Sequence, residues 1–399
     1  MKSITMMIGR MCFAAVLGGL ILSAAATAQE TNELGLTEEQ ALAYNAALDE
    51  AQQAASQRKF REATEAYRRA LEIYADDFLT YFNMGISFQS LRQEDSAQVY
   101  FNHAIEKNPH FGPARIALAN SHLKMDQVQD AETVFVALRD QLADSIEYVL
   151  AAEQGLYNVA IKYTNLAVAE LNNRDYDTAE QYSNRAIELA GDVFRPYYIA
   201  AMVQERKNKD EDARRLWDSA LARANSDEEK ALALNGIGRM EISTAKAAVR
   251  ANNDAAARRA RIQAVEHLRE STDLDPNRSS SWINLGNTLF DLGRYDEALD
   301  ALTRAEELER RDFRIPSKIA DTYIQLGDCA AAAEAAASRA IALQRTNANA
   351  HAVRAEALEC LGRKREAITE YETAARDPRW RQRATYQAKK LREELGISN

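Results

Sequence analysis

Few residues in this 399-residue sequence have the types and spacing that catalysis or metal binding requires. The five histidines are His103, His110, His122, His267 and His351, and none of them stands three or four residues from another. A helical histidine pair at that spacing, or a Cys/His group at zinc spacing, is the usual signature of a metal site. A glycine-rich phosphate loop and a strained nucleophile turn are also missing from the sequence. The sequence therefore predicts a protein with no metal, no cofactor and no enzymatic activity.

The first 28 residues have the composition of a secretory signal peptide. Lys2 and Arg10 give a positive start, residues 11–22 are apolar, and Ala26-Thr27-Ala28 is a small-residue cleavage pattern. The apolar run is shorter than the roughly 20 residues that cross a bilayer, which favours a cleaved signal over a retained anchor. We expect cleavage before Gln29. The signal is bacterial in style, so we expect the periplasm of a Gram-negative cell, with secretion as the second choice.

The composition narrows the fold and the partners. The chain carries a net charge of −10, which argues against nucleic acid as a partner because phosphate binding needs a concentrated basic surface. No stretch after the signal approaches membrane-spanning length, so we expect no membrane insertion once the signal is cleaved. Only 15 glycines and 6 prolines interrupt an alanine-rich chain with the apolar spacing of amphipathic helices. These features indicate an all-α protein.

The sharpest pattern lies in residues 281–308, where bulky and small residues alternate along two consecutive helices. Small residues let helices approach closely, and the bulky residues fill the space beside them. The spacing resembles the tetratricopeptide repeat, a helix–turn–helix unit of about 34 residues. One such unit cannot bury its own apolar face, so neighbouring units must stack on it. The residues that carry the resemblance are Trp282, Leu285, Gly286, Leu289, Gly293, Tyr295, Ala298, Leu302 and Ala305.

The resemblance extends over most of residues 37–377 and implies a fold. It implies an all-α, right-handed superhelix of about nine helical hairpins. We expect an N-terminal array of about five repeats in residues 29–225, with an extra helix near 144–158, and a C-terminal array in residues 263–378.

Two further segments depart from the repeat pattern. Residues 226–262 are rich in Ala and Arg and lack the turn glycine, so they predict one long helix or an inserted helix pair. Residues 379–399 predict a capping helix and tail, with Trp380, Ala384, Gln387 and Leu391 covering the last apolar seam.

The resemblance also implies a function, that of a non-catalytic scaffold or adaptor in the bacterial envelope. In this family the first helix of each unit lines a concave groove that binds peptide segments or partner proteins. An asparagine amide both donates and accepts, so it can pair with the backbone of any extended peptide; an asparagine here can also simply satisfy a neighbouring helix. The predicted peptide-binding residues are Asn83, Asn120, Asn165, Tyr198, Asn253, Asn284, Asn287, Arg314 and Lys318.

Arg314 and Lys318 suggest a narrower hypothesis. Family members that grip the terminal carboxylate of a peptide place cations at the second and sixth positions of one unit, and both residues occupy these positions. Asn284 occupies the matching sixth position one unit earlier, but Val249 stands where a lysine is expected, near Asn253. A carboxylate between the two cations would gain charge-assisted hydrogen bonds, unless Asp321 neutralises one of them.

Two other functions remain open at this stage. The chain would be a binding module for cell-wall glycan if Phe82, Tyr198 and Phe290 were stacking platforms, although packing between repeats explains the same rings. It would be a hydrolase if distant residues converged on one cleft. The sequence predicts neither the identity of the partner nor the oligomeric state.

We predict a disulfide between Cys329 and Cys360, the two cysteines outside the signal. The repeat geometry that the resemblance implies brings the start of one helix near the end of the next antiparallel helix, and export permits oxidation. Closing a loop of about 30 residues would stabilise the C-terminal repeats by roughly 3–4 kcal/mol. Peptide mapping of exported protein without reductant should find the two cysteines linked, whereas two unlinked thiols would contradict the prediction.

Overall fold

The computed structural model describes residues 31–327 and 330–397, which contain nineteen α-helices and no strand. They form two compact units, one up to Ser121 and one from His122 on. The all-α prediction is confirmed. The predicted signal peptide, 1–28, and Cys329 lie outside the described residues, so the disulfide stays a prediction; Cys360 is exposed at the end of its helix.

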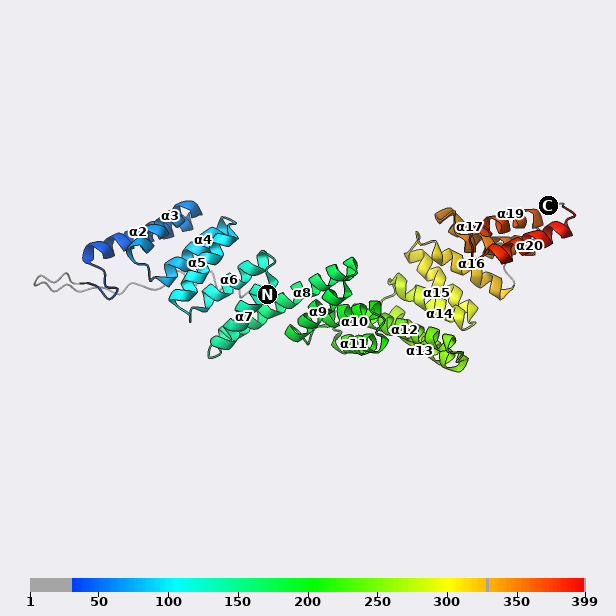
Figure 1. Cartoon of the computed structure of the whole chain (residues 1–399), viewed down its shortest axis with the longest axis horizontal. Coiled ribbons are helices and arrows are strands. Elements are labelled where there is room, and N and C mark those ends of the chain that lie inside the picture. Colours follow the sequence, from blue (N-terminus) through cyan, green and yellow to red (C-terminus); the bar gives the residue numbers. More distant parts are fainter. Residues whose placement is uncertain (1–30, 328–329, 398–399) are drawn as a thin grey trace, which may run out of the picture. The chain divides into compact units, whose positions relative to one another are not determined.

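The first unit is a stack of helical hairpins (Figure 1). Helix α2 packs on α3, α3 on α4, and α4 on α5, so neighbours in sequence are neighbours in space. The boundary between the units falls within α6. The bounds are α2 (Glu38–Ser56), α3 (Phe60–Ile73), α4 (Phe78–Ser90), α5 (Glu94–Lys107) and α6 (Gly112–Lys124).

The second unit continues the same pattern from α7 to α20, each helix contacting the next. Within this unit the helix pairs α8–α9, α10–α11, α12–α13, α14–α15, α16–α17 and α18–α19 follow one another, as the repeat pattern predicts. The bounds are α7 (Val128–Gln141), α8 (Ile146–Asn173), α9 (Tyr176–Leu189), α10 (Phe194–Arg206), α11 (Asp210–Arg223), α12 (Asp227–Arg250), α13 (Asp254–Leu274), α14 (Ser279–Asp291), α15 (Tyr295–Leu308), α16 (Arg314–Leu326), α17 (Ala330–Leu343), α18 (Ala348–Cys360), α19 (Lys364–Ala374) and α20 (Arg381–Glu394).

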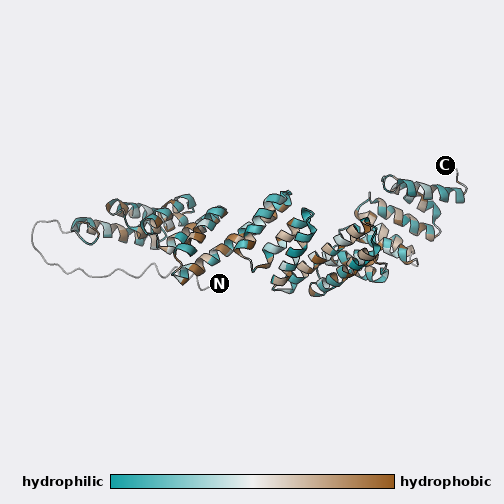
Figure 2. Cartoon of the chain, turned by 60° about the horizontal axis from the view of Figure 1, so that its bottom comes forward, coloured by the Kyte–Doolittle hydropathy of each residue, from teal (hydrophilic) through white to brown (hydrophobic). Residues whose placement is uncertain are grey.

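The hairpins close because glycines and alanines let the helices touch. A Cβ placed on Gly286 would lie 2.6 Å from Cγ of Leu302, and one on Gly155 would lie 2.3 Å from the ring of Phe135. No real side chain tolerates such distances, so these positions require glycine. Figure 2 shows hydrophobic and hydrophilic residues interspersed along the helices, and buried apolar residues are found in helices from α2 to α20. The same close approach is found at Gly85, Gly236 and Gly238.

The turns between paired helices share a left-handed backbone conformation. Gly293, Gly327 and Gly362 have positive φ angles of 77°, 77° and 76°, the left-handed conformation that suits glycine. The turn after α12 places Asn252 in that conformation, with φ 53°. Asparagine tolerates this region better than most side chains, so the missing glycine did not mean a missing turn. Residues 226–262, for which the sequence predicts one long helix or an inserted helix pair, form α12 and the start of α13, a long hairpin that packs on α11 and α14.

The predicted extra helix at 144–158 is not a separate element. It is the N-terminal half of α8, which runs without a break to Asn173. Gly155 does not end the helix, because it is a contact point for Phe135. The buried face continues from Ala152 and Leu156 through Val159 to Tyr163.

The C-terminal helix covers the last repeat, as the sequence predicts. Ala384 and Leu391 of α20 are fully buried in a cluster with Tyr371 of α19, and Trp380 packs against the same cluster. Gln387, predicted to share this face, is half-buried. The exposed side of α20 is mostly charged, as solubility requires of an end cap.

We predict that Gly286→Ala destabilises the protein. Helix propensity alone would favour alanine by about 1 kcal/mol, but the new methyl group meets Leu302 at 2.6 Å. Overpacking of this kind costs about 1–3 kcal/mol, so the midpoint of urea unfolding should fall. In the double variant Gly286→Ala, Leu302→Ala the two losses should not add, because removing Leu302 makes room for the methyl group. A midpoint unchanged or raised by Gly286→Ala would contradict the close packing of α14 on α15.

Candidate functional site

The first helices of four successive hairpins, α12, α14, α16 and α18, contact one another in order in the second unit. Each presents polar side chains near these contacts. We call this set the first-helix face; its residues are Asn235, Ser280, Asn284, Asn287, Ser317, Lys318, Asp321 and Asn349.

Amide side chains join α12 to α14. Nδ2 of Asn284 donates to Oδ1 of Asn235 at 2.8 Å, and Nδ2 of Asn235 donates to Oγ of Ser280 at 3.2 Å. Asn235 is only 3% exposed. Asn284 therefore satisfies a neighbouring helix, which is the structural alternative that the sequence left open. Asn287, one turn further along α14, is half-buried, and its side chain has no hydrogen bond within the described residues.

A lysine and an aspartate lie next along the face, on α16. Nζ of Lys318 is 3.2 Å from the centre of the Phe290 ring, a cation–π contact. Burial lowers the pKa of Lys318, while the charges of Asp321 and Asp291 act in the opposite direction. Burial raises the pKa of Asp321, partly offset by a hydrogen bond from Asn349 and by Lys318. The face thus holds a half-buried mixed pair of charges.

Asn349 links α18 to α16 much as Asn284 links α14 to α12. Its Nδ2 donates to Oγ of Ser317 at 3.1 Å and to Oδ2 of Asp321 at 3.2 Å. Glu356 lies about two helical turns further along α18. Burial raises its pKa, and the charge of Asp321 adds to that rise. Amides and charged groups therefore alternate from α12 to α18.

The structure does not form an open pair of cations from Arg314 and Lys318. The guanidinium of Arg314 is bidentate on Asp312, with Nε–Oδ1 2.8 Å and Nη2–Oδ2 2.6 Å, and its side chain is 77% exposed. This hydrogen bond lowers the pKa of Asp312. Lys318 instead faces the Phe290 ring. Both cations already have partners, so a peptide carboxylate would have to displace Asp312 from Arg314.

The other predicted residues are scattered. Asn83 is half-buried in α4 and Asn120 is exposed in α6, both within the first unit. Asn165 is exposed in α8 of the second unit. Asn253 lies off the first-helix face, because it is the N-cap of α13 and accepts from the backbone of Ala256 at 3.0 Å. It therefore stands in the turn between α12 and α13 and not on a first helix.

The aromatic rings considered as glycan platforms are engaged in packing. Phe82 is 5% exposed and lies 5.1 Å from the ring of Phe111. Tyr198 meets the buried Trp217 edge-on at 5.3 Å. Phe290 lies between Tyr295, at 5.4 Å, and the ammonium of Lys318. All three rings therefore already pack against other side chains.

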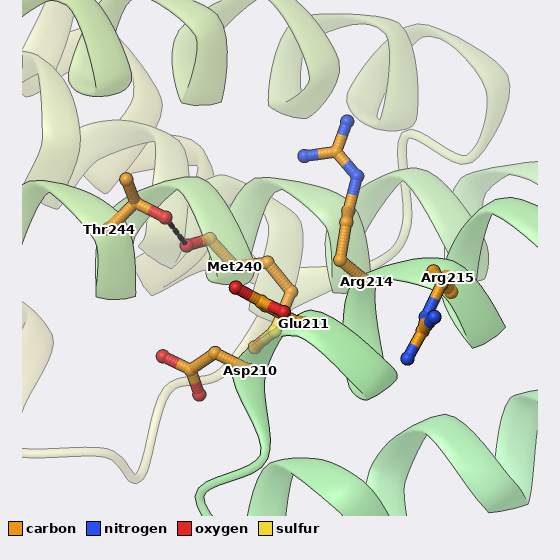
Figure 3. Close-up of a pocket in the computed structure, with 6 residues that line it drawn as sticks. All are labelled: Asp210, Glu211, Arg214, Arg215, Met240 and Thr244. Carbon is orange, nitrogen blue, oxygen red and sulfur yellow. Dashed lines mark hydrogen bonds between the residues drawn. The ribbon is translucent and has the colours of Figure 1, made fainter.

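A pocket of about 410 Å³ lies between α11 and α12, and none of its lining residues is a predicted site residue (Figure 3). Its side chains are Asp210, Glu211, Arg214, Arg215, Met240 and Thr244. The guanidinium groups of Arg214 and Arg215 point away from the carboxylates of Asp210 and Glu211 in Figure 3. Arg214 pairs with Glu241, Arg215 with Asp212, and Asp210 accepts from Ser243. Arg214, Arg215 and Asp210 are thus each engaged with a nearby side chain outside the pocket lining.

No group of three or more His, Cys, Asp or Glu side chains within the described part of the chain could hold a metal ion. No helix within residues 31–327 and 330–397 has the length and apolar character that crossing a membrane demands.

Asn235 and Asn349 were missed by the sequence reasoning, although a signal existed for Asn349. The turn glycines Gly293, Gly327 and Gly362 mark the end of the first helix in three successive repeats, with spacings of 34 and 35 residues. Counting back from each turn glycine places Asn349 at the same position as Ser280 and Arg314. Asn235 had no turn glycine from which to count.

Comparison with known proteins places the repeats in one family. Models described as tetratricopeptide repeat match residues 90–155, 163–193, 279–312 and 317–382. No curated protein matches the chain.

Several solved structures are similar to the chain. YrrB, a repeat protein described as having an unusual peptide-binding site, is 20% identical over 48% of this chain and 89% of its own, with a TM-score of 0.36. Yeast Tom70 is 14% identical over 89% of this chain and 96% of its own, with a TM-score of 0.34. The first repeat domain of Spaghetti (RPAP3), bound to an HSP90 peptide, is 28% identical over 31% of this chain and 96% of its own, with a TM-score of 0.29.

The repeat models match segments in both units, and within each unit consecutive helices pack on one another in sequence order. The chain is therefore a tetratricopeptide repeat protein.

Proposed function

We propose that this chain is a non-catalytic adaptor that binds peptide segments or partner proteins along the first-helix face of its second unit. Tetratricopeptide repeat proteins generally act as protein–protein interaction scaffolds. The observation that carries the proposal is the row of amide and charged side chains from Asn235 to Asn349, held in place on four successive helices. A surface fixed in advance loses little conformational entropy on binding.

Asn287 and Lys318 are the groups best placed to contact a guest. Asn287 keeps its amide unbonded, so it can donate to and accept from a peptide backbone. Lys318 offers a charge that Phe290 orients and burial keeps poorly hydrated. Asp321, beside it, makes this position suited to a segment with mixed polarity rather than to a purely anionic one. Affinity would be the sum of many modest contacts, with a few buried anchors dominating.

The two alternatives find less support. The rings of Phe82, Tyr198 and Phe290 pack against other side chains, which leaves little for a glycan to stack on. The charged groups of the pocket between α11 and α12 are used in local pairs, which is unlike a hydrolase centre.

We also propose that the adaptor works in the bacterial periplasm, an inference supported by residues 1–28 alone. Expression of the full sequence in a Gram-negative host should place the protein in the periplasmic fraction. N-terminal sequencing should then read from Gln29, because signal peptidase cuts after small residues such as Ala26 and Ala28. Protein that retains Met1 and fractionates with the membrane would overturn this part of the proposal.

The binding proposal predicts the effect of a double substitution. Peptides without acidic runs, selected by display on the wild-type chain, should bind the variant Asn287→Ala, Lys318→Ala at least tenfold more weakly in fluorescence anisotropy. The reason is that the substitutions remove the unbonded amide and the oriented cation of the face.

The matched control is Thr303→Ala, Arg310→Ala, which removes one neutral polar group and one cation from exposed positions on α15 and the loop after it. It should change affinity less than twofold. Equal weakening by both variants, or full binding by the first, would overturn the first-helix face as the binding surface. Thermal unfolding of each variant, followed by circular dichroism, checks that the fold is kept.

A further inference from the structure

The longest hairpin of the second unit extends beyond its neighbours. Helices α12 and α13 have 24 and 21 residues, whereas α14 to α17 have 13 or 14 each. Matching the close-contact glycines Gly238 and Gly286 places the excess at the turn end. Residues 244–260 therefore project about two helical turns past the adjoining hairpins. We call them the basic arm.

The basic arm is an ordered element with a small core of its own. Ala245, Ala257 and Ala260 are 2%, 0% and 4% exposed, so the two helices remain in close contact up to the turn. In the turn, the backbone N–H of Asn253 donates to the carbonyl of Ala248 at 2.9 Å. The side chain of Asn253 then caps α13. An alanine-rich sequence with a capped start also has high intrinsic helix propensity.

Its surface carries four cations and one carboxylate. Lys246, Arg250, Arg258 and Arg259 are exposed, and none has an ion pair or hydrogen bond within the described residues. Asp254, at the turn, is the one acidic residue of the arm. This differs from the flanking parts of the second unit, where Arg214, Arg239 and Arg269 pair with glutamates. It also differs from the chain as a whole, whose net charge is −10.

The unpaired cations come at an energetic cost to the fold. Lys246 and Arg250 stand four residues apart on α12, where like charges repel and a Glu–Arg pair would stabilise the helix. Arg258 and Arg259 are adjacent on α13. A hairpin that served only as structure would gain stability from acidic partners at these places. The retained repulsion is relieved when an anionic partner binds.

Helical periodicity puts three of the cations on the same side of the arm. Lys246 follows Asn235 by three full turns, and Asn235 faces α14, to which its amide is bonded. Arg258 lies one turn before Arg261, whose Nε is 4.0 Å from Oδ2 of Asp291 at the end of α14. Lys246, Arg250 and Arg258 therefore overhang the side on which the next hairpin stacks.

We propose that the basic arm is a second docking surface, for an acidic segment of a partner protein. A stretch of aspartates and glutamates would neutralise the three overhanging cations and reach Arg259 across the arm, with charge-assisted hydrogen bonds to the guanidinium groups. Ala247, Ala251 and Ala255 are exposed, and their small side chains let an extended or helical backbone approach the arm closely. This surface is separate from the first-helix face, because none of its cations belongs to that face.

An anionic lipid surface is the competing partner, and the turn of the arm argues against it. Residues 251–254, Ala-Asn-Asn-Asp, are small and polar, and they end in a carboxylate. Membrane-docking elements instead present aromatic or large apolar side chains that enter the interface. The acidic protein segment therefore fits the arm better.

The test uses the full chain and a fluorescein-labelled octaglutamate peptide, with octaglutamine as the neutral probe. The wild-type chain should bind octaglutamate, bind octaglutamine much more weakly, and lose affinity as salt rises, since exposed charges are screened within about 10 Å at 0.1 M salt. The variant K246E, R250E, R258E, R259E should bind octaglutamate at least tenfold more weakly. The corresponding alanine variant, which keeps helix propensity, should also lose binding.

The matched control reverses four other exposed arginines that have no side-chain partner within the described residues: R310E, R311E, R345E and R365E. It changes the net charge equally, so it should weaken octaglutamate binding less than threefold. If both sets of charge reversals weakened octaglutamate binding equally, net charge alone would explain the loss, and the proposal would be overturned. Arm-dependent binding to phosphatidylglycerol vesicles without arm-dependent binding of octaglutamate would overturn it in favour of a membrane. Peptides selected on the first-helix face should bind the arm variants normally, so either proposal can fail without the other.

Discussion

The fold depends on how closely a glycine lets one helix approach another. At Gly85, Gly155, Gly236, Gly238 and Gly286 an added Cβ would fall 2.3–2.8 Å from a large side chain, so the side chain takes the place that a methyl group would occupy. Leu268, Trp217 and Leu302 are almost fully buried as a result. Because interiors are packed to crystalline density, these contacts fix the spacing of the two helices within a hairpin and, at Gly155 and Gly236, of one hairpin against the next. The positions of the functional side chains follow from that spacing.

The first-helix face shows this dependence directly. Asn284 reaches Asn235, and Asn349 reaches Ser317, only because α12, α14, α16 and α18 lie within amide reach of each other. A looser stack would leave the same amides hydrated and mobile. The long hairpin α12–α13 adds a different kind of surface, because residues beyond the stack have no neighbours to neutralise them. One set of packing rules thus gives a rigid polar face where helices meet and an unpaired basic arm where they do not.

Much of the fold was predictable because the repeat signals are local. Bulky–small alternation, as in Leu285, Gly286 and Leu302, reports a helix contact that the chain makes with its own next helix. The capping role of α20 was predictable for the same reason, from Trp380, Ala384 and Leu391. The repeat pattern was less informative about where one helix ends, since the extra helix predicted near 144–158 is the N-terminal half of the continuous α8.

The candidate site was less predictable. Which side chains pair depends on distances between helices, and the position of a residue within its repeat does not give those distances. Repeat position alone predicted that Arg314 and Lys318 act together as a pair of cations. In the structure Arg314 is hydrogen-bonded to Asp312, and Lys318 makes a cation–π contact with Phe290. Position also put Asn253 in the groove, although it caps a helix. Asn284 and Asn287 have similar positions and identical chemistry, yet only Asn287 keeps its amide unbonded. These differences arise from neighbours on adjacent helices, and the sequence of one repeat does not specify them.

The most direct test of this account is amide hydrogen exchange of the full chain, followed by mass spectrometry, with and without a peptide selected on it. If nested hairpins create the binding face, the peptide should slow exchange in α14, α16 and α18, and leave α15, α17 and α19 unchanged. Protection found mainly in the second helices of the hairpins would contradict the account.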